Sequence, residues 1–374
     1  MLKKANSHQR NIYMKGSTAH NITYVQAINE ALDLSLKKDR SVFVIGLGVP
    51  DPKGIFGATV GLQKKYGGNR VMDMPVSENG ITGVCIGAAI SGMRPVLTHQ
   101  RVDFSLLALE QVINNAAKWH YMFGGRQSVP LVIKVTIGMG WGQGAQHSQN
   151  LQAVYAHIPG LKVVMPSTPA DAKGLMVSAI EDNNPVIYID HRWLHDTFGQ
   201  VPSGYYKVPI GKASIVKKGE AITIVSTSHM TIESIKAANL LKKMGINPEI
   251  IDVRTLKPLD EQTIFDSVSK TKRLLVADLG YKSFGAAAEI IAAVSENQKV
   301  KLLTNPQRIT SPDLPTPSTP ALAKYYYPRY IDIARKVVKM VGGNRKKLEV
   351  LIKEEEKNRI TPLDVPDKDF KGPF

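Results

Sequence analysis

Short runs of apolar residues alternate with amphipathic segments along most of the chain. The segment 23–38 places Val25, Ile28, Leu32 and Leu36 on one face of a helix. Nearly continuous apolar runs, typical of strands buried on both faces of a parallel sheet, separate such helical segments. In the first half these runs lie at 41–48, 71–74, 95–99, 129–137, 161–166 and 185–190. Their alternation with helices predicts right-handed crossovers in a doubly wound parallel α/β sheet.

The same alternation resumes after a polar stretch that is typical of a linker, because it is punctuated by glycine and proline. Further strands are expected at 221–228, 248–254, 273–279 and 301–304, followed by a proline-rich surface loop at 304–320. A helix is also expected at 57–67. The predicted organisation is a basic extension at 1–20, an α/β domain at 21–198, a linker at 199–220, a second α/β domain at 221–341 and a charged tail at 342–374.

The stretch 71–96 stands out because three glycines recur on one face of a predicted helix. Gly80, Gly83 and Gly87 leave this face without side chains, so another backbone can approach it closely. Glycine inside a helix costs about 1 kcal/mol relative to alanine, so three on one face require a reason. Tight helix packing is the simplest reason on composition alone. One carboxylate, Glu78, lies at the start of the helix, and the apolar run is shorter than the roughly 20 residues of a membrane span.

The chain of 374 residues has a formal net charge of +16 but contains no nucleic-acid-binding motif. The basic excess is spread along the sequence, which favours a lysine-rich solvated surface, an acidic protein partner or a phosphorylated ligand. The single cysteine, Cys85, lies among apolar residues and cannot form a disulfide within one chain. We therefore expect a reducing compartment, the cytoplasm. The first acidic residue is Glu30, so a mitochondrial or other organellar presequence stays open, although arginines are few.

A glycine-rich loop follows the apolar run at 129–137. The segment from Gly140 to Ala145 fits the dinucleotide-binding pattern G-x-G-x-x-A, but the acidic residue expected about 20 positions later is absent up to Ala170. A nicotinamide-dependent dehydrogenase is therefore only a second choice. The sequence also lacks a P-loop, a G-x-S-x-G motif and a metal-spaced group of Cys and His. His147 follows the same loop, and the sequence leaves open whether it is structural or catalytic.

Several motifs occur in one order between about residues 23 and 341. The first half contains MPVSENGITGVCIGAAISGMRPV, ALEQVINNAAKWHYMFGG, AQHSQ, PGLKVVMPSTPADAKGL and AIEDNNPVIYID, and the second contains DVRTLKPLD and FGAAAEI. Together they resemble the β subunit of the E1 component of 2-oxo acid dehydrogenases, of the pyruvate and branched-chain type. That family belongs to the transketolase-like, thiamine-diphosphate-dependent superfamily. The resemblance implies a pyrimidine-binding-type α/β domain followed by a transketolase C-terminal-type α/β domain.

The resemblance implies thiamine diphosphate as the cofactor and assigns roles to particular residues. This cofactor becomes a nucleophile when its thiazolium C2 loses a proton, which requires a carboxylate beside N1′ of its aminopyrimidine. Glu78 in S-E-N-G matches that glutamate, and a partly apolar cleft suits it, because a carboxyl there retains its proton more readily. Phe104 matches the aromatic residue packed on the pyrimidine, and Gln100 is assigned to the cofactor as well. His147 in A-Q-H-S-Q matches an active-site histidine, which gives it a catalytic role.

The resemblance also implies a bound monovalent cation such as K⁺, which some family members hold. Backbone carbonyls hold this ion, so it leaves no side-chain signature in the sequence. The matching positions here are Leu131, Ala179, Asp182 and Asn184.

One part of the superfamily's active site is missing from the sequence. Members bind Mg²⁺ and the diphosphate through a G-D-G motif and a later Asn, and this chain contains no G-D-G. The resemblance therefore implies that an E1 α-type subunit supplies this half, with most of the Mg²⁺ ligands, in a heterotetramer of two α and two β subunits. It further implies decarboxylation of a 2-oxo acid and transfer of the acyl unit to a lipoyl group on the acyltransferase E2.

The segment 98–102 (T-H-Q-R-V) departs from the family, which carries mostly apolar or aromatic residues with an acid there. His99 and Arg101 put polar and cationic groups close to the expected position of the substrate. If they face the cleft, they favour a polar or anionic substrate; in the alternative interpretation they face away from it.

Two other functions stay open. The C-terminal half of a split transketolase would act on sugar phosphates, and polar residues at positions 99 and 101 would suit it, whereas the H-S-Q and D-N-N-P motifs favour E1. A non-catalytic scaffold or nucleic-acid-binding module is favoured by the net charge alone.

Overall fold

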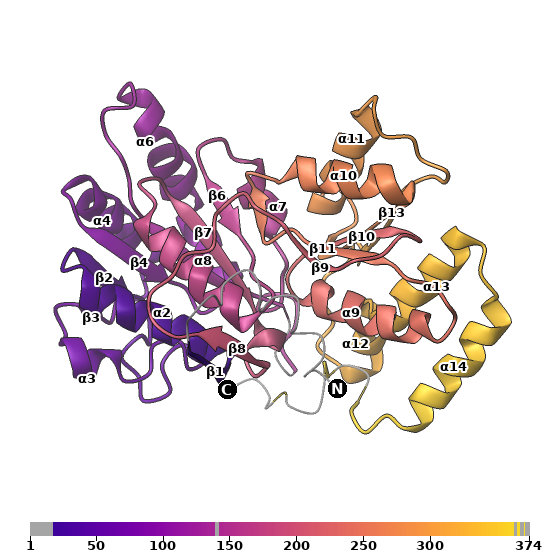
Figure 1. The fold of residues 1–374 in the computed structure, drawn as a ribbon. Helices are drawn as coiled ribbons and strands as arrows, with labels where there is room; N and C mark the ends of the chain where they lie inside the picture. Colours follow the sequence, from indigo (N-terminus) through magenta and orange to yellow (C-terminus); the bar gives the residue numbers. More distant parts are fainter. Residues whose placement is uncertain (1–17, 139–141, 363–364, 367–369, 371–374) are drawn as a thin grey trace.

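Two mostly parallel sheets, one in each half of the chain, organise the fold (Figure 1). The structure is a computed structural model that describes residues 18–138, 142–362, 365–366 and 370. The strands of the first half are β1 (Ala19–Thr23), β2 (Val42–Ile45), β3 (Val71–Met72), β4 (Arg94–Thr98), β5 (Val132–Ile137), β6 (Lys162–Val164), β7 (Val186–His191) and β8 (Phe198–Pro202). Its helices are α2 (Tyr24–Lys38), α3 (Leu62–Tyr66), α4 (Glu78–Ile90), α5 (Val102–Ser105), α6 (Ala117–Met122), α7 (Gln152–His157) and α8 (Pro169–Glu181).

The second half repeats this alternation. Its strands are β9 (Ser214–Lys217), β10 (Thr223–Ser226), β11 (Glu249–Asp252), β12 (Thr255–Lys257), β13 (Leu274–Tyr281) and β14 (Gln307–Ser311). Its helices are α9 (His229–Lys242), α10 (Glu261–Thr271), α11 (Ala286–Glu296), α12 (Pro320–Tyr326), α13 (Tyr330–Val341) and α14 (Arg345–Lys357). Short helical turns complete the chain: η2 (Leu106–Ala108) and the π-helical η3 (Gln111–Ala116) join α5 to α6, and η4 (Arg192–Leu194) follows β7. None of the helices in the described ranges combines the length and apolar composition that crossing a bilayer requires.

The first sheet has the strand order β12-β6-β7-β5-β4-β2-β3 and is parallel except at β12. Strand β2 shows how it is buried on both faces, because its side chains alternate between them. Val42 and Val44 join the apolar cluster of α2 and α8, whereas Phe43 and Ile45 join the cluster that includes α4. The second sheet has the order β14-β13-β10-β11-β9, with β9 antiparallel. The prediction of two doubly wound α/β domains is therefore confirmed.

Three segments differ from their predicted structure. The stretch 301–304 is not a strand, because Leu303 is exposed. The strand in this region is β14, which lies inside the predicted proline-rich loop, pairs with β13 and buries Ile309. Only Leu62–Tyr66 of the expected helix 57–67 is helical, because Gly57 and Gly61 have positive φ angles that interrupt it. The stretch 199–220 contains β9 and most of β8, which pairs with β1.

The two halves share polar and apolar contacts. Strand β12 comes from the second half but pairs with β6 of the first sheet, and one apolar cluster extends from the first sheet to the second. Arg254 donates from Nη1 to Oδ1 of Asp171 on α8 at 2.9 Å, and Gln152 on α7 donates to Oδ1 of Asp278 on β13 at 2.9 Å. These contacts fix the second unit against the carboxyl side of the first sheet.

Asp252, at the end of β11, gives this junction a pH dependence. Burial raises the pKa of Asp252 to about 7, and the negative charge of Asp171 adds to the effect. Between the ordinary carboxyl pKa and about 7, the folded chain therefore holds a proton that the unfolded chain has lost. The contribution of Asp252 to stability should therefore fall as the pH rises through this window, by at most about 1.4 kcal/mol per pH unit.

The substitution Asp252→Asn should remove this fall. The stability of the variant relative to the unsubstituted chain should rise between pH 5 and pH 7 and level off above, as measured by denaturant unfolding at a series of pH values. Asp266→Asn, which removes an exposed carboxylate from α10, is the control for the loss of one negative charge. A constant difference between the Asp252→Asn and unsubstituted chains across this range would contradict the assignment.

Candidate functional site

The residues that the sequence singles out follow the carboxyl ends of neighbouring strands. Glu78 comes after β3, Gln100 and Phe104 come after β4, and His147 comes after β5. These strands are parallel members of one sheet, so their carboxyl ends meet at the same edge. That edge is where ligands bind in open α/β sheets, which makes it the candidate site.

Glu78 is the first residue of α4 and is only 7% exposed, although Val76, two residues before it, is 76% exposed. The N-terminus of a helix favours a negative charge, because the first backbone N–H groups point toward it. The hydroxyl of Thr82 donates to the backbone carbonyl of Glu78 at 2.7 Å, one turn further along the helix. The acid is thus sheltered although it borders an exposed part of the chain's surface.

The glycine face of α4 is open within this chain. A Cβ atom added at Gly87 would have no other atom within 4 Å, and one at Gly83 would only touch the side chain of Gln111 at 3.4 Å. Val84, on the same face, is 61% exposed, and Leu107 of the neighbouring turn η2 is also exposed. Packing inside the chain therefore does not explain the glycines at 83 and 87, and the face is available to another polypeptide.

Phe104 and His147 come together although they follow different strands. Their ring centroids lie 5.2 Å apart with an edge-to-face angle of 88°. Beside them, Gln149 donates to Oδ1 of Asp103 at 2.7 Å, which ties the His147 segment to α5. Phe104 is half-buried and His147 is exposed. Helix α4, with Glu78, packs against the turns η2 and η3 that continue α5, so the acid, the aromatic ring and the imidazole lie on adjoining elements.

The polar segment after β4 is held by the protein itself. His99 is 3% exposed, and burial lowers its pKa to about 4, so its imidazole is neutral near pH 7. The side chain of Gln100 donates to the carbonyl of Leu47 at 3.2 Å. Arg101 is 2% exposed, and its guanidinium donates to Gly138 O at 2.8 Å. Burial lowers the pKa of Arg101 to about 10, which leaves it charged. Contact of His99 or Arg101 with a substrate stays a prediction.

A buried polar cluster at the same edge escaped the sequence analysis. Lys134 on β5 and His195 contact the same oxygen of Asp190 on β7, at 2.8 and 3.1 Å, and all three are fully or almost fully buried. Lys134 together with His195 holds the pKa of Asp190 well below its usual range, despite burial, which opposes this shift. The available signal was a lysine inside the otherwise apolar run 129–137, which a strand buried on both faces tolerates only with a partner.

The expected cation site is already partly engaged by protein donors. The carbonyl of Leu131 accepts from the backbone N–H of Val186 at 2.9 Å, and that of Ala179 accepts from Asp182 at 3.3 Å. The guanidinium of Arg94 donates to the carbonyl of Asp182 at 3.0 Å. A monovalent cation there, with Asn184 as a further ligand, stays a prediction. Among the described residues, no group of three or more His, Cys, Asp or Glu side chains is arranged to hold a metal ion.

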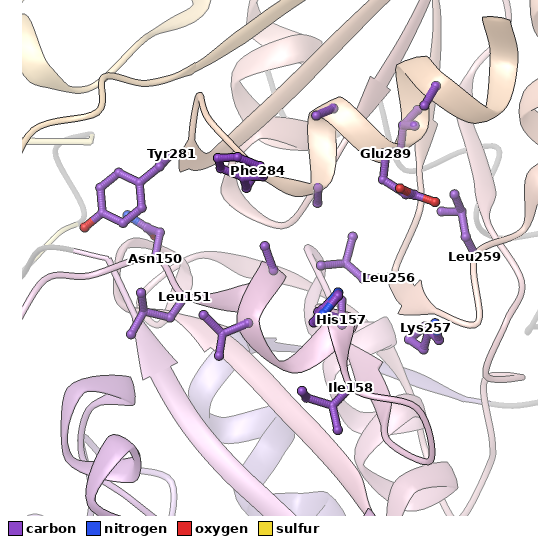
Figure 2. Close-up of a pocket in the computed structure, with 18 of the residues that line it drawn as sticks. Asn150, Leu151, His157, Ile158, Leu256, Lys257, Leu259, Tyr281, Phe284 and Glu289 are labelled. Atoms are coloured by element: carbon purple, nitrogen blue, oxygen red, sulfur yellow. The ribbon is translucent and has the colours of Figure 1, made fainter. Parts of the chain in front are cut away.

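A separate cleft of about 1060 Å³ lies between α7 and α11 (Figure 2). Leu151 and Ile158 line one side of it, and the almost fully exposed Phe284 lies on the other. None of the predicted site residues is among the described residues that line this cleft. The candidate site and this cleft are therefore different places.

The predicted dinucleotide pattern falls partly outside the described residues, because Gly140 and Trp141 are not among them. The same holds for residues 1–17 of the basic extension. The dinucleotide alternative gains no support from the comparisons with known proteins.

Those comparisons match both halves of the chain. Residues 20–195 match the family described as "Transketolase, pyrimidine binding domain", and residues 211–333 match "Transketolase, C-terminal domain". The β subunit of acetoin:2,6-dichlorophenolindophenol oxidoreductase from Cupriavidus necator is 40% identical over 337 residues, which cover 87% of this chain and 99% of that protein. The mitochondrial pyruvate dehydrogenase E1 component subunit beta of Bos taurus is 40% identical over 330 residues, covering 87% of this chain and 92% of that protein.

A solved structure described as "Split gene transketolase, inactive beta4 tetramer" has the same fold, with a TM-score of 0.67 at 21% identity. The match covers 88% of this chain and all of that one. The two family matches, in this order, and the identity to E1 β subunits over most of the sequence agree with the motifs that follow β3, β4 and β5. The chain belongs to the family of E1 β subunits of 2-oxo acid dehydrogenases, within the transketolase-like superfamily.

Proposed function

We propose that the chain is the β subunit of a thiamine-diphosphate-dependent E1 enzyme whose active site is completed by an α-type subunit. The reaction would be decarboxylation of a 2-oxo acid, followed by transfer of the acyl unit to a lipoyl group on an E2 acyltransferase. One observation carries most weight: Glu78 is sheltered at the start of a helix on which Gly87 has no neighbour within 4 Å and Val84, beside it, is exposed. A buried acid beside an unfilled face suits a cofactor held between two subunits.

The side chains fit this cofactor in their chemistry. When bound, thiamine diphosphate supplies a carbon nucleophile and an electron sink for the loss of CO₂. In this proposal Glu78 would lie beside the pyrimidine ring and its carboxyl would give up and take back a proton there. Phe104 would pack against that ring, and Gln100 would support the cofactor from the end of β4. His147, which is exposed, moves protons on the substrate side.

The chain does not account for the diphosphate half of the site. It contains no G-D-G motif, and its described residues provide no cluster of metal ligands. We therefore assign Mg²⁺ and the diphosphate to the α-type partner, in a heterotetramer. The net charge of +16 suits docking of an acidic E2 partner. A cytoplasmic location is kept as part of the proposal, although some relatives are named as mitochondrial proteins.

A split transketolase is the second candidate, since one protein of this fold is described in those words. That similarity is at 21% identity and supports the fold alone, whereas E1 β subunits are about twice as similar in sequence. The comparison therefore favours the E1 assignment.

The substitution Glu78→Gln tests the proposed proton exchange. A carboxamide cannot take up and release the proton, so kcat of the reconstituted α/β pair should fall by roughly 10²–10⁴-fold, the usual contribution of a positioned acid–base group. The measurement is pyruvate- or branched-chain-2-oxo-acid-dependent reduction of dichlorophenolindophenol. Glu296→Gln, at the exposed end of α11, is the matched control and should leave kcat unchanged. Activity of Glu78→Gln above half that of the unsubstituted pair would refute the proposed role.

The substitution Gly87→Leu tests the open helix face. Leucine should leave the isolated chain as stable as before or make it more stable, because nothing lies within 4 Å and glycine is about 1 kcal/mol less favourable than a good helix former. The same side chain should obstruct the partner, so co-expressed α-type and β chains should no longer co-elute in size-exclusion chromatography.

Gly68→Leu is the control, since Gly68 is also exposed and free of neighbours but lies outside α4. Normal pairing of a folded Gly87→Leu chain would show that this face is not the subunit contact.

A further inference from the structure

We propose that Arg101 is a positioning residue, which holds the segment that carries His147 in place instead of binding the substrate. The catalytic consequence of this role rests on the proposed function, whereas its structural consequence does not. Arg101 lies in the segment 98–102, where the chain departs from the family motif.

Arg101 ties two parts of the sheet edge together. Its Nη1 donates to the carbonyl of Gly138, just after β5, at 2.8 Å, and its Nη2 donates to the side-chain oxygen of Gln143. Four residues beyond Gln143 lies His147, whose backbone N–H closes a turn onto the carbonyl of Gly144 at 3.2 Å. One guanidinium therefore links the end of β4, the end of β5 and the segment 142–147.

The acceptor at Gly138 is itself fixed. Gly138 has a φ angle of +78°, and a Cβ atom there would lie 2.4 Å from the ring of His191. The backbone thus passes close against β7, in a conformation that glycine adopts without strain. The carbonyl of Gly138 is therefore held in place, and Arg101, which donates to it, also holds the side chain of Gln143.

The guanidinium of Arg101 also lies against an aromatic ring. It lies 5.0 Å from the ring centroid of Phe56, which also carries the guanidinium of Arg192 at 5.2 Å. Arg192 in turn lies 5.4 Å from the ring of Phe370 in the C-terminal tail. Stacking on aromatic faces and forked donation are properties of arginine that lysine lacks. The arrangement orients Arg101 before any ligand binds.

Burial excludes direct contact of this side chain with solvent-borne substrate in the described arrangement. Arg101 is 2% exposed, and its Nε is buried without a hydrogen-bond partner. Both terminal nitrogens donate to the protein. A buried charge costs several kcal/mol unless its hydrogen bonds offset that cost, and here those bonds end on the active-site segment. Its effect on the reaction should therefore pass through His147.

The experiment combines Arg101→Gln, Arg101→Lys and Gln143→Ala in the reconstituted α/β pair. Loss of the two hydrogen bonds from the Arg101 guanidinium should lower kcat by about 10²-fold, the effect expected when a catalytic group is misplaced by about 1 Å. KM should change little. Relative to the unsubstituted pair, kcat should fall by the same factor with monoanionic pyruvate and with dianionic 2-oxoglutarate. The effects of Arg101→Gln and Gln143→Ala should be less than additive in the double variant, because each substitution removes the link between the two side chains.

Gln143→Glu keeps an acceptor for Arg101 and should retain activity. Arg126→Gln, at an exposed arginine outside the site, is the control for charge. A change in the preference between pyruvate and 2-oxoglutarate would instead identify Arg101 as a substrate contact and overturn the proposal. Additive effects of the Arg101 and Gln143 substitutions would overturn it too.

Hydrogen exchange separates this inference from the proposed function. In the isolated full chain, Gln143→Ala should speed exchange of the backbone amides at 142–147, without changing exchange in α9 of the second half. This substitution leaves Arg101 in place, so misfolding does not obscure the result. Unchanged exchange at 142–147 would refute the positioning role, whether or not the pair decarboxylates 2-oxo acids. An inactive unsubstituted pair with the expected exchange would refute the function alone.

Discussion

The structure depends on the shelter of one carboxylate at a surface that the chain leaves open. Glu78 is buried at the first turn of α4, whereas the outer face of the same helix presents exposed Val84 and the unpacked Gly87. Glycine costs helix stability, and no contact within the chain offsets this cost at Gly87. The cost is understandable if a second polypeptide packs there and encloses the acid. In the proposed function, the open face and the sheltered acid belong to one shared site.

The parallel sheet explains how residues distant in sequence reach that site. Its strands end at a common edge, so the loops after β3, β4 and β5 bring Glu78, Phe104 and His147 onto adjoining elements. The buried polar groups at the same edge have a structural role instead. Asp190 neutralises Lys134 between the strands, and Arg101 links the strand ends. These buried charges join neighbouring strands, whereas Phe104 is half-buried and His147 is exposed.

Local patterns predicted much of this fold. The 3.6-residue period of Ile28, Leu32 and Leu36 defines α2, in which all three are buried, and the apolar runs of the first half correspond to its buried strands. The misplaced strand at 301–304 shows the limit of such patterns. Leu302 and Leu303 resemble a strand locally, but pairing with β13 selects the more polar β14. Register and edge position depend on distant partners, which a local pattern does not contain.

The sequence proposes members of the site but does not predict its electrostatics. Family motifs point to Glu78, Phe104 and His147, and the structure brings the two rings together. The burial and neutrality of His99 were not predictable from the sequence, nor was the contact of Arg101 with Phe56, 45 positions earlier, because burial and ring contacts arise only after folding.

Calorimetry with thiamine diphosphate and Mg²⁺ distinguishes a chain that holds half of a cofactor site from one that holds a complete site. The isolated chain should bind the cofactor weakly or not at all, because it lacks the diphosphate half, and the chain paired with its α-type subunit should bind it tightly. Submicromolar binding by the isolated chain would contradict the account.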